Sequence, residues 1–183
     1  MTTGKYILSL FKKNGLTQSD VARGTRLSRQ SLNYITSGKR SLTLPQALRL
    51  ESFFSLRQGS LLQMQDNDRI QEHIKAIRHS LCDKLLKIKA FWSFADVTEE
   101  SISDEDLIEK TFIHLDMAEI SQLFEIFPQN LIRKVWTERM ACQGEYLLPL
   151  NMMIAQYYFN IKNPRLFLHK QETARIKRLT NDA

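Results

Sequence analysis

This chain of 183 residues has few glycines and prolines, few cysteines and no long apolar run, and each of these features excludes a class of structure. Six glycines, four prolines and little strict alternation of apolar and polar residues predict a mostly helical chain. The two cysteines, Cys82 and Cys142, lie in apolar surroundings without paired spacing, which favours reduced thiols over a disulfide. No run approaches the roughly 18 apolar residues of a membrane-spanning helix, and Lys12 and Lys13 interrupt the N-terminal apolar segment where a signal peptide would continue. We therefore expect an all-α cytoplasmic protein without a membrane segment.

Positive charge is concentrated at the N-terminal end. Residues 1–65 contain ten Lys or Arg residues against Asp20 and Glu51, which gives this part a net charge of +8. The rest of the chain carries −2, since the whole chain carries +6. This asymmetry predicts an anionic partner for the N-terminal part, with DNA, RNA and an anionic membrane surface as the candidates.

Helix-start signals divide the first 66 residues into five short helices. Thr17 with Asp20 has the form of a capping box, Ser28 is a favourable N-cap, and Thr43 precedes a proline in a first helical turn. The expected helices lie near residues 4–13, 17–24, 28–36, 43–55 and 59–66. The glycines expected at helix ends, in conformations of positive φ, are Gly15, Gly24 and Gly38.

Residues 67–92 are predicted to form a longer amphipathic helix with one apolar stripe. Its apolar residues recur at steps of three and four, and they are Ile70, Ile74, Ile77, Leu81, Leu85, Ile88 and Trp92. The stripe either docks on its own chain or pairs with a second copy as in a coiled coil. In the second case it would hold a dimer or a partner.

Residues 93–183 are predicted to form a small helical domain for partner binding or dimerisation. Residues 99–132 contain nine carboxylates against Lys110, whereas residues 133–183 contain nine Lys or Arg residues against four acidic ones. These charges indicate solvated helix faces or a binding surface, and the acidic cluster could imitate nucleic acid. That cluster comprises Glu99, Glu100, Asp104, Glu105 and Asp106. Most of the aromatic residues are expected in the core, from the set Phe91, Trp92, Phe94, Trp136, Tyr157, Tyr158 and Phe159.

The strongest functional signal is LTQSDVARGTRLSRQSLNYITSGKRSLT, residues 16–43. Two short helices joined by a three-residue turn would turn Val21, Leu32 and Ile35 inward and leave polar residues on the outside of the second helix. A helix of this size fits the major groove, where Arg bonds guanine and Gln or Asn bonds adenine. The candidate base-reading residues are Ser28, Arg29, Gln30 and Asn33. The candidate phosphate contacts are Gln18, Ser19, Ser37, Lys39 and Arg40.

The stretch TQSDVARGTRLSRQSLNYITSGKRSLTLPQALRL resembles the five-helix helix-turn-helix domain of phage repressors and HigA-type antitoxins. The resemblance covers residues 4 to about 66. It implies that Arg29, Gln30 and Asn33 read bases and that Gln18 binds phosphate. One departure is that the turn carries Thr25 and Arg26, where the family usually has glycine among small residues.

A second resemblance covers about residues 91–168. The segments FWSF, DEDLIEKTFIHLDMAEISQLFEIFPQNLIRKVW and YYFNIKNPR are similar to small helical domains of antitoxin-like partners of abortive-infection nucleotidyltransferase toxins. It implies that the C-terminal region binds a toxin.

Catalytic alternatives are few. His79 and Cys82 share a helical face and could give two metal ligands, or they are a packed thiol beside a half-exposed imidazole. Asp66 and Asp68 follow Gly59 and Ser60 in a pattern superficially like that of nucleotidyltransferases, but the interval is too short, and a helix end and linker fits better. We expect no enzyme activity, no bound metal and no cofactor.

The sequence therefore predicts three segments, residues 1–66, 67–92 and 93–183, in a repressor that binds a double-stranded DNA operator as a homodimer. The resemblances further imply an antitoxin that represses its own operon and neutralises a cognate toxin through residues 93–183. The alternatives are a protein-interaction adaptor and a stand-alone regulator without a toxin.

Overall fold

The chain divides into two compact units, residues 1–73 and 74–183, in a computed structural model that describes residues 1–91 and 97–181. These described residues form ten α-helices, three short 3-10 or π segments and no strand, which confirms the all-α prediction. Trp92 and Phe94 lie outside the described residues. Each unit has its own apolar core, and each is described below by itself.

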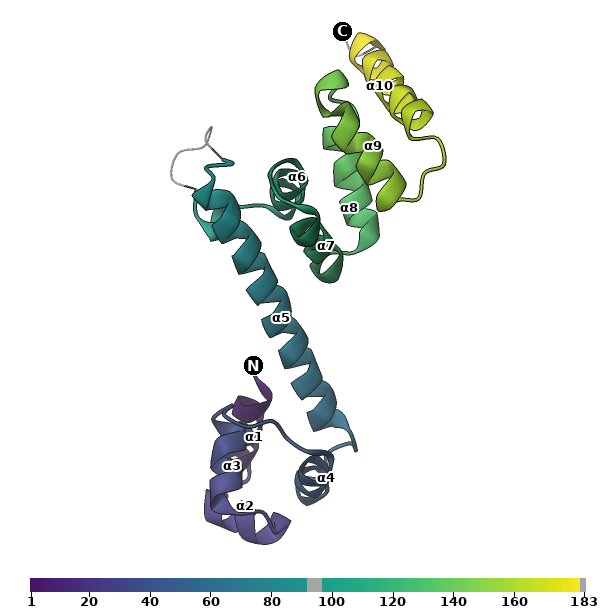
Figure 1. The fold of residues 1–183 in the computed structure, drawn as a ribbon. Helices are drawn as coiled ribbons and strands as arrows, with labels where there is room; N and C mark the ends of the chain where they lie inside the picture. The colour runs from purple at the N-terminus through teal and green to yellow at the C-terminus, as the bar shows by residue number, and fades with distance from the viewer. Residues whose placement is uncertain (92–96, 182–183) are drawn as a thin grey trace. The chain divides into compact units, whose positions relative to one another are not determined.

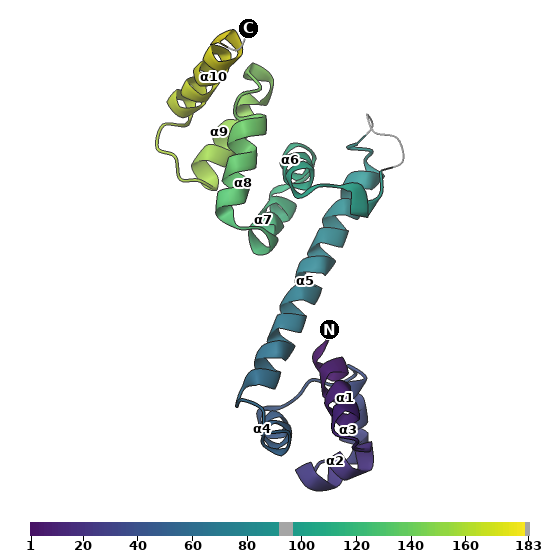
Figure 2. The same cartoon turned by 180° about the vertical axis from the view of Figure 1, so that it is seen from behind.

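The N-terminal unit contains four short helices and the first part of a long one (Figure 1). The helices are α1 (Thr3–Lys13), α2 (Gln18–Thr25), α3 (Arg29–Thr36), α4 (Leu44–Phe53) and the beginning of α5 (Ser60–Lys87). In both views α1 and α3 lie side by side, with α2 at one end of α3 (Figures 1 and 2). The core between them is formed by Ile7, Phe11, Val21, Ala22, Leu32, Ile35, Leu42, Ala47, Leu50 and Leu61.

Side-chain caps fix where these helices begin. The Thr17 hydroxyl accepts the amide of Asp20 at 3.3 Å, and the Asp20 carboxylate accepts the amide of Thr17 at 3.0 Å, so the predicted capping box is present. The Ser28 hydroxyl accepts the amide of Ser31 at 3.1 Å at the start of α3. These bonds satisfy amides that the helix itself leaves unpaired, so the start of each helix is encoded locally in the sequence.

The turn between α2 and α3 is closed by a residue that ordinarily avoids its conformation. Arg26 adopts the left-handed region with φ 55°, in the place where a glycine would be free of steric cost. Its carbonyl accepts a hydrogen bond from the Arg49 guanidinium at 3.3 Å, which ties the turn to α4. The departure from the family's usual glycine therefore leaves the turn intact but in a strained backbone conformation.

The prediction for the three glycines is confirmed at Gly15 and Gly38, which have φ values of 62° and 75°. It is wrong at Gly24, which lies inside α2. A Cβ atom at Gly24 would stand 2.1 Å from Cε2 of Phe53, so a side chain here would have to displace that aromatic ring. Such a contact between distant residues is not visible in the local sequence.

A buried carboxylate joins α4 to the start of α5. Glu51 is fully buried, and its two oxygens accept the amides of Gly59 and Leu61, each at 2.8 Å. The amide of Leu61 belongs to the first turn of α5, where a negative charge is favourable to the helix dipole. Glu51 therefore serves as a remote cap for the longest helix of the protein.

α5 differs from its predicted form, because the helix expected near 59–66 and the helix expected over 67–92 are one continuous helix, Ser60–Lys87. The polar run QDNDR contains no residue that breaks a helix, and Asp68 is engaged with α1 through its bonds to the amide and hydroxyl of Thr3, at 2.6 and 2.7 Å. Tertiary contacts thus help to keep α5 helical across QDNDR, which the sequence predicted to be a helix end and linker.

The apolar stripe of α5 has mixed surroundings. Ile77, Leu81 and Leu85 are buried in the core of the C-terminal unit, so docking on their own chain holds for these three. Ile70 is exposed and Ile74 is half-buried, whereas Ile88 lies beyond the end of α5 and is exposed, and Trp92 lies outside the described part of the chain. Dimerisation through the buried three would require that core to open, and the role of the others stays a prediction.

The C-terminal unit continues with a bundle of helices after the second half of α5. The helices are α6 (Asp104–His114), α7 (Met117–Ile126), α8 (Gln129–Val135), α9 (Leu148–Tyr157) and α10 (Pro164–Asn181), with a π segment at Trp136–Met140 and 3-10 turns at Glu99–Ser101 and Glu145–Leu147. Figure 2 shows α10 lying along α9, and the two helices are in contact.

Trp136 is the centre of this second core. It is fully buried, its ring stacks on Phe159 and Phe167 at 5.0 and 5.7 Å between centroids, and its indole N–H donates to the Asn151 side-chain oxygen at 2.8 Å. Asn151 also donates to the Met140 carbonyl at 2.9 Å, inside the π segment. The core prediction is confirmed for Phe91, Trp136 and Phe159, Tyr158 is partly buried, and Tyr157 is 67% exposed.

Replacing Glu51 with Gln should lower the free energy of unfolding of the N-terminal unit by about 1.5–3 kcal/mol, the usual value of a hydrogen bond to a charged group. The amide would turn an N–H toward one of the two backbone donors. Denaturation followed by circular dichroism measures the change, and Glu72→Gln, an exposed change of the same kind on α5, is the control. Equal stability of the two variants would show that the buried carboxylate does not hold α5.

Replacing Arg26 with Gly should raise the stability of the same unit by about 0.5–1 kcal/mol, because glycine adopts the left-handed conformation without a steric penalty. The carbonyl that Arg49 contacts would remain. Arg23→Gly, at a helical position of α2, is the matched control and should destabilise by about 1 kcal/mol. Urea midpoints of the two variants should therefore move in opposite directions, and a shift of Arg26→Gly toward lower urea would contradict the strain assigned to the turn.

Candidate nucleic-acid interface

The outward face of α3 is made of the residues predicted to read bases. Leu32, Ile35 and Thr36 are buried against the core. All four predicted base-reading residues are exposed, namely Ser28, Arg29, Gln30 and Asn33. The helix therefore separates an apolar face that fixes it from a polar face that carries two amides, a guanidinium and a hydroxyl.

Gln18 ties the helix before the turn to the first residue of α3. Its side-chain amide donates to the carbonyl of Arg29 at 3.0 Å. Gln18 and Ser19 are half-exposed at the beginning of α2, where free backbone amides and the helix dipole favour an anion. Gln18 keeps one N–H that can donate to a phosphate oxygen.

The loop after α3 presents the predicted phosphate-binding cations. Lys39 and Arg40 are exposed there, next to Gly38. The loop is held from α5, because the Gln65 amide accepts the Leu42 amide at 2.6 Å and donates to its carbonyl at 3.2 Å. The cations therefore project from a segment whose backbone is fixed.

Ser37 is exposed at the end of α3, and its hydroxyl already donates to the carbonyl of Tyr34 at 3.3 Å. A serine has one O–H, so a phosphate contact from Ser37 would replace this internal bond. Ser37 therefore differs from Lys39 and Arg40, the predicted phosphate contacts of the following loop, because its donor is already used within the protein.

Tyr34 is the functional candidate that the sequence prediction missed. It is 37% exposed on the same face as Gln30, one helical turn further along, and its hydroxyl accepts a hydrogen bond from the Gln30 side-chain nitrogen at 3.1 Å. Positions four apart on a helix are neighbours, so the spacing of Gln30 and Tyr34 was a signal for this pair.

Charges around the reading helix are not all positive. Hydrogen bonds from Thr17 hold the pKa of Asp20 below its usual value, with smaller help from the positive charges of Arg23 and Arg29. Asp20 therefore stays ionised near α3, and the positive charges of Arg23 and Arg29 partly offset its repulsion of DNA.

The residues considered for metal binding or catalysis are buried or engaged by other side chains. His79 contacts Glu99 with 2.6 Å between Nδ1 and Oε2, whereas Cys82 is buried and its burial raises the pKa of the thiol. Asp66 pairs with Arg69 at 3.7 Å, and Asp68 is held by Thr3 as described above. Within residues 1–91 and 97–181, no group of three His, Cys, Asp or Glu residues is placed to hold a metal ion.

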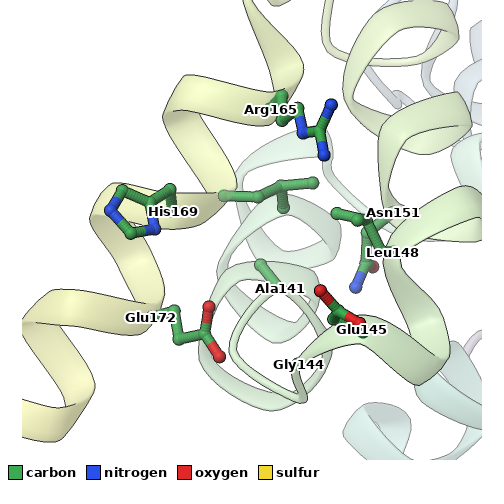
Figure 3. Close-up of a pocket in the computed structure, with 9 residues that line it drawn as sticks. Ala141, Gly144, Glu145, Leu148, Asn151, Arg165, His169 and Glu172 are labelled. Carbon is green, nitrogen blue, oxygen red and sulfur yellow. The ribbon is translucent and has the colours of Figure 1, made fainter.

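A pocket of about 250 Å³ lies in the C-terminal unit between the start of α9 and α10 (Figure 3). Arg165, His169 and Glu172 line it from α10, and Glu145 and the buried Asn151 line it from the other side. The Asn151 amide is already engaged by Trp136 and Met140. The pocket therefore brings opposite charges to its rim but shows no nucleophile beside a base.

The acidic cluster is partly engaged inside the unit. Glu99 contacts His79, Asp104 pairs with Arg78, and Asp106 pairs with Arg139 at 2.7 Å. These ion pairs connect α6 and the preceding turn to α5 and the π segment. These three carboxylates therefore have partners within the C-terminal unit, whereas imitation of nucleic acid stays a prediction.

Among the described helices, none has both the length and the apolar character needed to cross a membrane.

Comparison with known proteins agrees with the geometry of the N-terminal unit. Residues 7–57 match the family model described as helix-turn-helix. No curated protein and no solved structure matches the chain. The likeness of residues 91–168 to partners of nucleotidyltransferase toxins stays a prediction. The match and the exposed polar face of α3 together identify residues 7–57 as a helix-turn-helix domain and support a DNA-binding regulator of transcription.

Proposed function

We propose that the protein is a sequence-specific transcriptional repressor that acts as a homodimer in the cytoplasm. The observation that carries the proposal is the outward face of α3, where Arg29, Gln30 and Asn33 are all exposed on a helix fixed by its buried face. A two-fold operator would receive one reading helix in each of two major grooves, about one helical turn of DNA apart.

In this role the side chains divide into two groups. Arg29 is suited to the two acceptors of guanine, and Gln30 and Asn33 to the donor and acceptor of adenine. Gln18, Lys39 and Arg40 are suited to phosphate oxygens, which set the register of the helix without reading sequence. Repression follows from occupation of the promoter, with no reaction catalysed and no cofactor required.

We further propose that the repressor is an antitoxin whose residues 93–183 bind a cognate toxin. Two things support this: the resemblance of the N-terminal domain to HigA-type antitoxins, and a C-terminal unit with a core of its own. A separate core gives the chain a second folded surface for a protein partner. The same protein would then repress its operon and neutralise the toxin that the operon encodes.

Binding to labelled DNA from upstream of its own gene tests the repressor proposal, with a scrambled duplex for comparison at two salt concentrations. Wild type should prefer the upstream DNA at two chains per duplex. Arg29→Ala and Gln30→Ala should each remove about 1–3 kcal/mol of that preference. Each phosphate contact should contribute about −0.9 to the slope of log affinity against log salt concentration.

Arg165→Ala, an exposed arginine of the C-terminal unit, is the control for lost charge. It should leave the preference for the upstream duplex unchanged. If wild type binds both duplexes equally, or binds neither, self-repression is wrong and an interaction adaptor becomes the better explanation. If Arg29→Ala weakens both duplexes by the same factor, Arg29 contacts phosphate and not a base.

The antitoxin proposal predicts a stable complex with the product of a neighbouring gene. Co-expression of the full chain with that product should yield a complex of fixed stoichiometry and restore growth that the product alone arrests. Arg29→Ala should still restore growth, because toxin binding is assigned to the other unit. A protein that purifies alone, and leaves the arrest in place, would contradict the antitoxin role without affecting DNA binding.

A further inference from the structure

We propose that Tyr34 is a positioning residue that makes Gln30 selective for adenine over guanine. The inference rests on the proposed function, because it concerns how α3 distinguishes bases. It assigns to Tyr34 an effect on DNA that acts through the amide of its neighbour.

The geometry is a single hydrogen bond on the exposed face of α3. The Gln30 nitrogen Nε2 donates to the Tyr34 hydroxyl at 3.1 Å. The backbone below the tyrosine is fixed, since the carbonyl of Tyr34 accepts the amide of Arg40 at 3.1 Å and the hydroxyl of Ser37 at 3.3 Å. The phenol hydroxyl offers an acceptor to a side chain that would otherwise rotate freely in solvent.

This bond changes what Gln30 has left for a base. A primary amide carries two N–H donors and one carbonyl acceptor. With one N–H given to Tyr34, Gln30 keeps one N–H and its carbonyl oxygen. Adenine presents one acceptor, N7, and one donor, N6–H, at its major-groove edge. The remaining groups of Gln30 match adenine in number and kind.

Guanine is the base that the bond disfavours. Its major-groove edge presents two acceptors, N7 and O6. To satisfy both, Gln30 would need both N–H groups and would lose its bond to Tyr34. Without the tyrosine hydroxyl, the amide can turn both donors toward guanine at no internal cost. Removing that hydroxyl should therefore relax discrimination between the two purines.

The test begins with selection of preferred duplexes from a random library by the wild-type full-length protein. The position at which Gln30→Ala loses its base preference is the position that Gln30 reads. Affinities for the four base pairs at that position are then measured for wild type, Tyr34→Phe, Gln30→Ala and the double variant. Tyr6→Phe, a tyrosine packed against the core of the same unit, is the control.

Wild type should prefer adenine over guanine by roughly tenfold or more. Tyr34→Phe should reduce this ratio by about fivefold, the factor expected for one net hydrogen bond. Its affinity for scrambled DNA and its salt dependence should stay at the wild-type values. In the Gln30→Ala background, the same tyrosine change should have no effect on the ratio, and Tyr6→Phe should behave as wild type.

Three results would overturn the inference while the repressor role stands. They are an unchanged purine ratio in Tyr34→Phe, an equal loss of affinity for all four base pairs, and a Gln30→Ala protein that keeps the full preference of wild type. The second would mean that Tyr34 supports the helix or a general contact. If wild type selects no sequence at all, the proposed function fails and the inference fails with it.

Discussion

The burial of Leu32 and Ile35 is the constraint on which the DNA-facing surface depends. α3 has only eight residues, and an isolated helix of that length is not stable in water. Each of the two side chains contributes about 1.5–3 kcal/mol when fully buried. Because they lie three apart on one side of the helix, residues 30, 33 and 34 must lie on the solvent side, and Arg29 is exposed in the first turn. The packing requirement thus also sets the reading face.

Apolar packing is not directional, so burial of one face does not by itself fix where such a short helix begins and ends. Glutamine amides supply that direction, since each can donate and accept at once. Gln46 accepts the amide of Thr43 at 3.0 Å and donates to the hydroxyl of Ser31 at 3.1 Å, which joins the start of α4 to α3. Gln65 holds the loop after α3 in the same manner, and Gln18 holds the start of α3 through its donated bond.

Sequence reasoning predicted what is encoded within a few residues. The capping box at Thr17, the cap at Ser28 and the inward positions of α3 follow from local chemistry and helical period, and the structure confirms them. Sequence reasoning failed where a residue far away in the chain determines the local structure. The ring of Phe53 lies against Gly24, and Thr3 bonds Asp68 in the polar run of α5.

The same limit applies to the C-terminal unit. A pattern of aromatic residues predicts a core, and Trp136 and Phe159 are in it. The pattern does not tell which of the adjacent Tyr157 and Tyr158 faces inward, because that depends on the position of α7. Phe124 of α7 stacks on Tyr158 at 4.9 Å between centroids, which leaves Tyr157 on the outside.

Hydrogen bonds inside the DNA-facing surface bear on specificity as well as on stability. The net charge of +8 over residues 1–65 attracts any DNA, and attraction of this kind does not distinguish sequences. Discrimination needs groups that cannot adapt to every partner. Gln18, Gln30 and Ser37 each have a donor engaged within the protein, at 3.0, 3.1 and 3.3 Å. A base or phosphate that requires that donor must break an internal bond, whereas one that uses the remaining groups binds without that cost. In the proposed role, the bonds that order the surface are therefore also the bonds that limit which DNA it accepts.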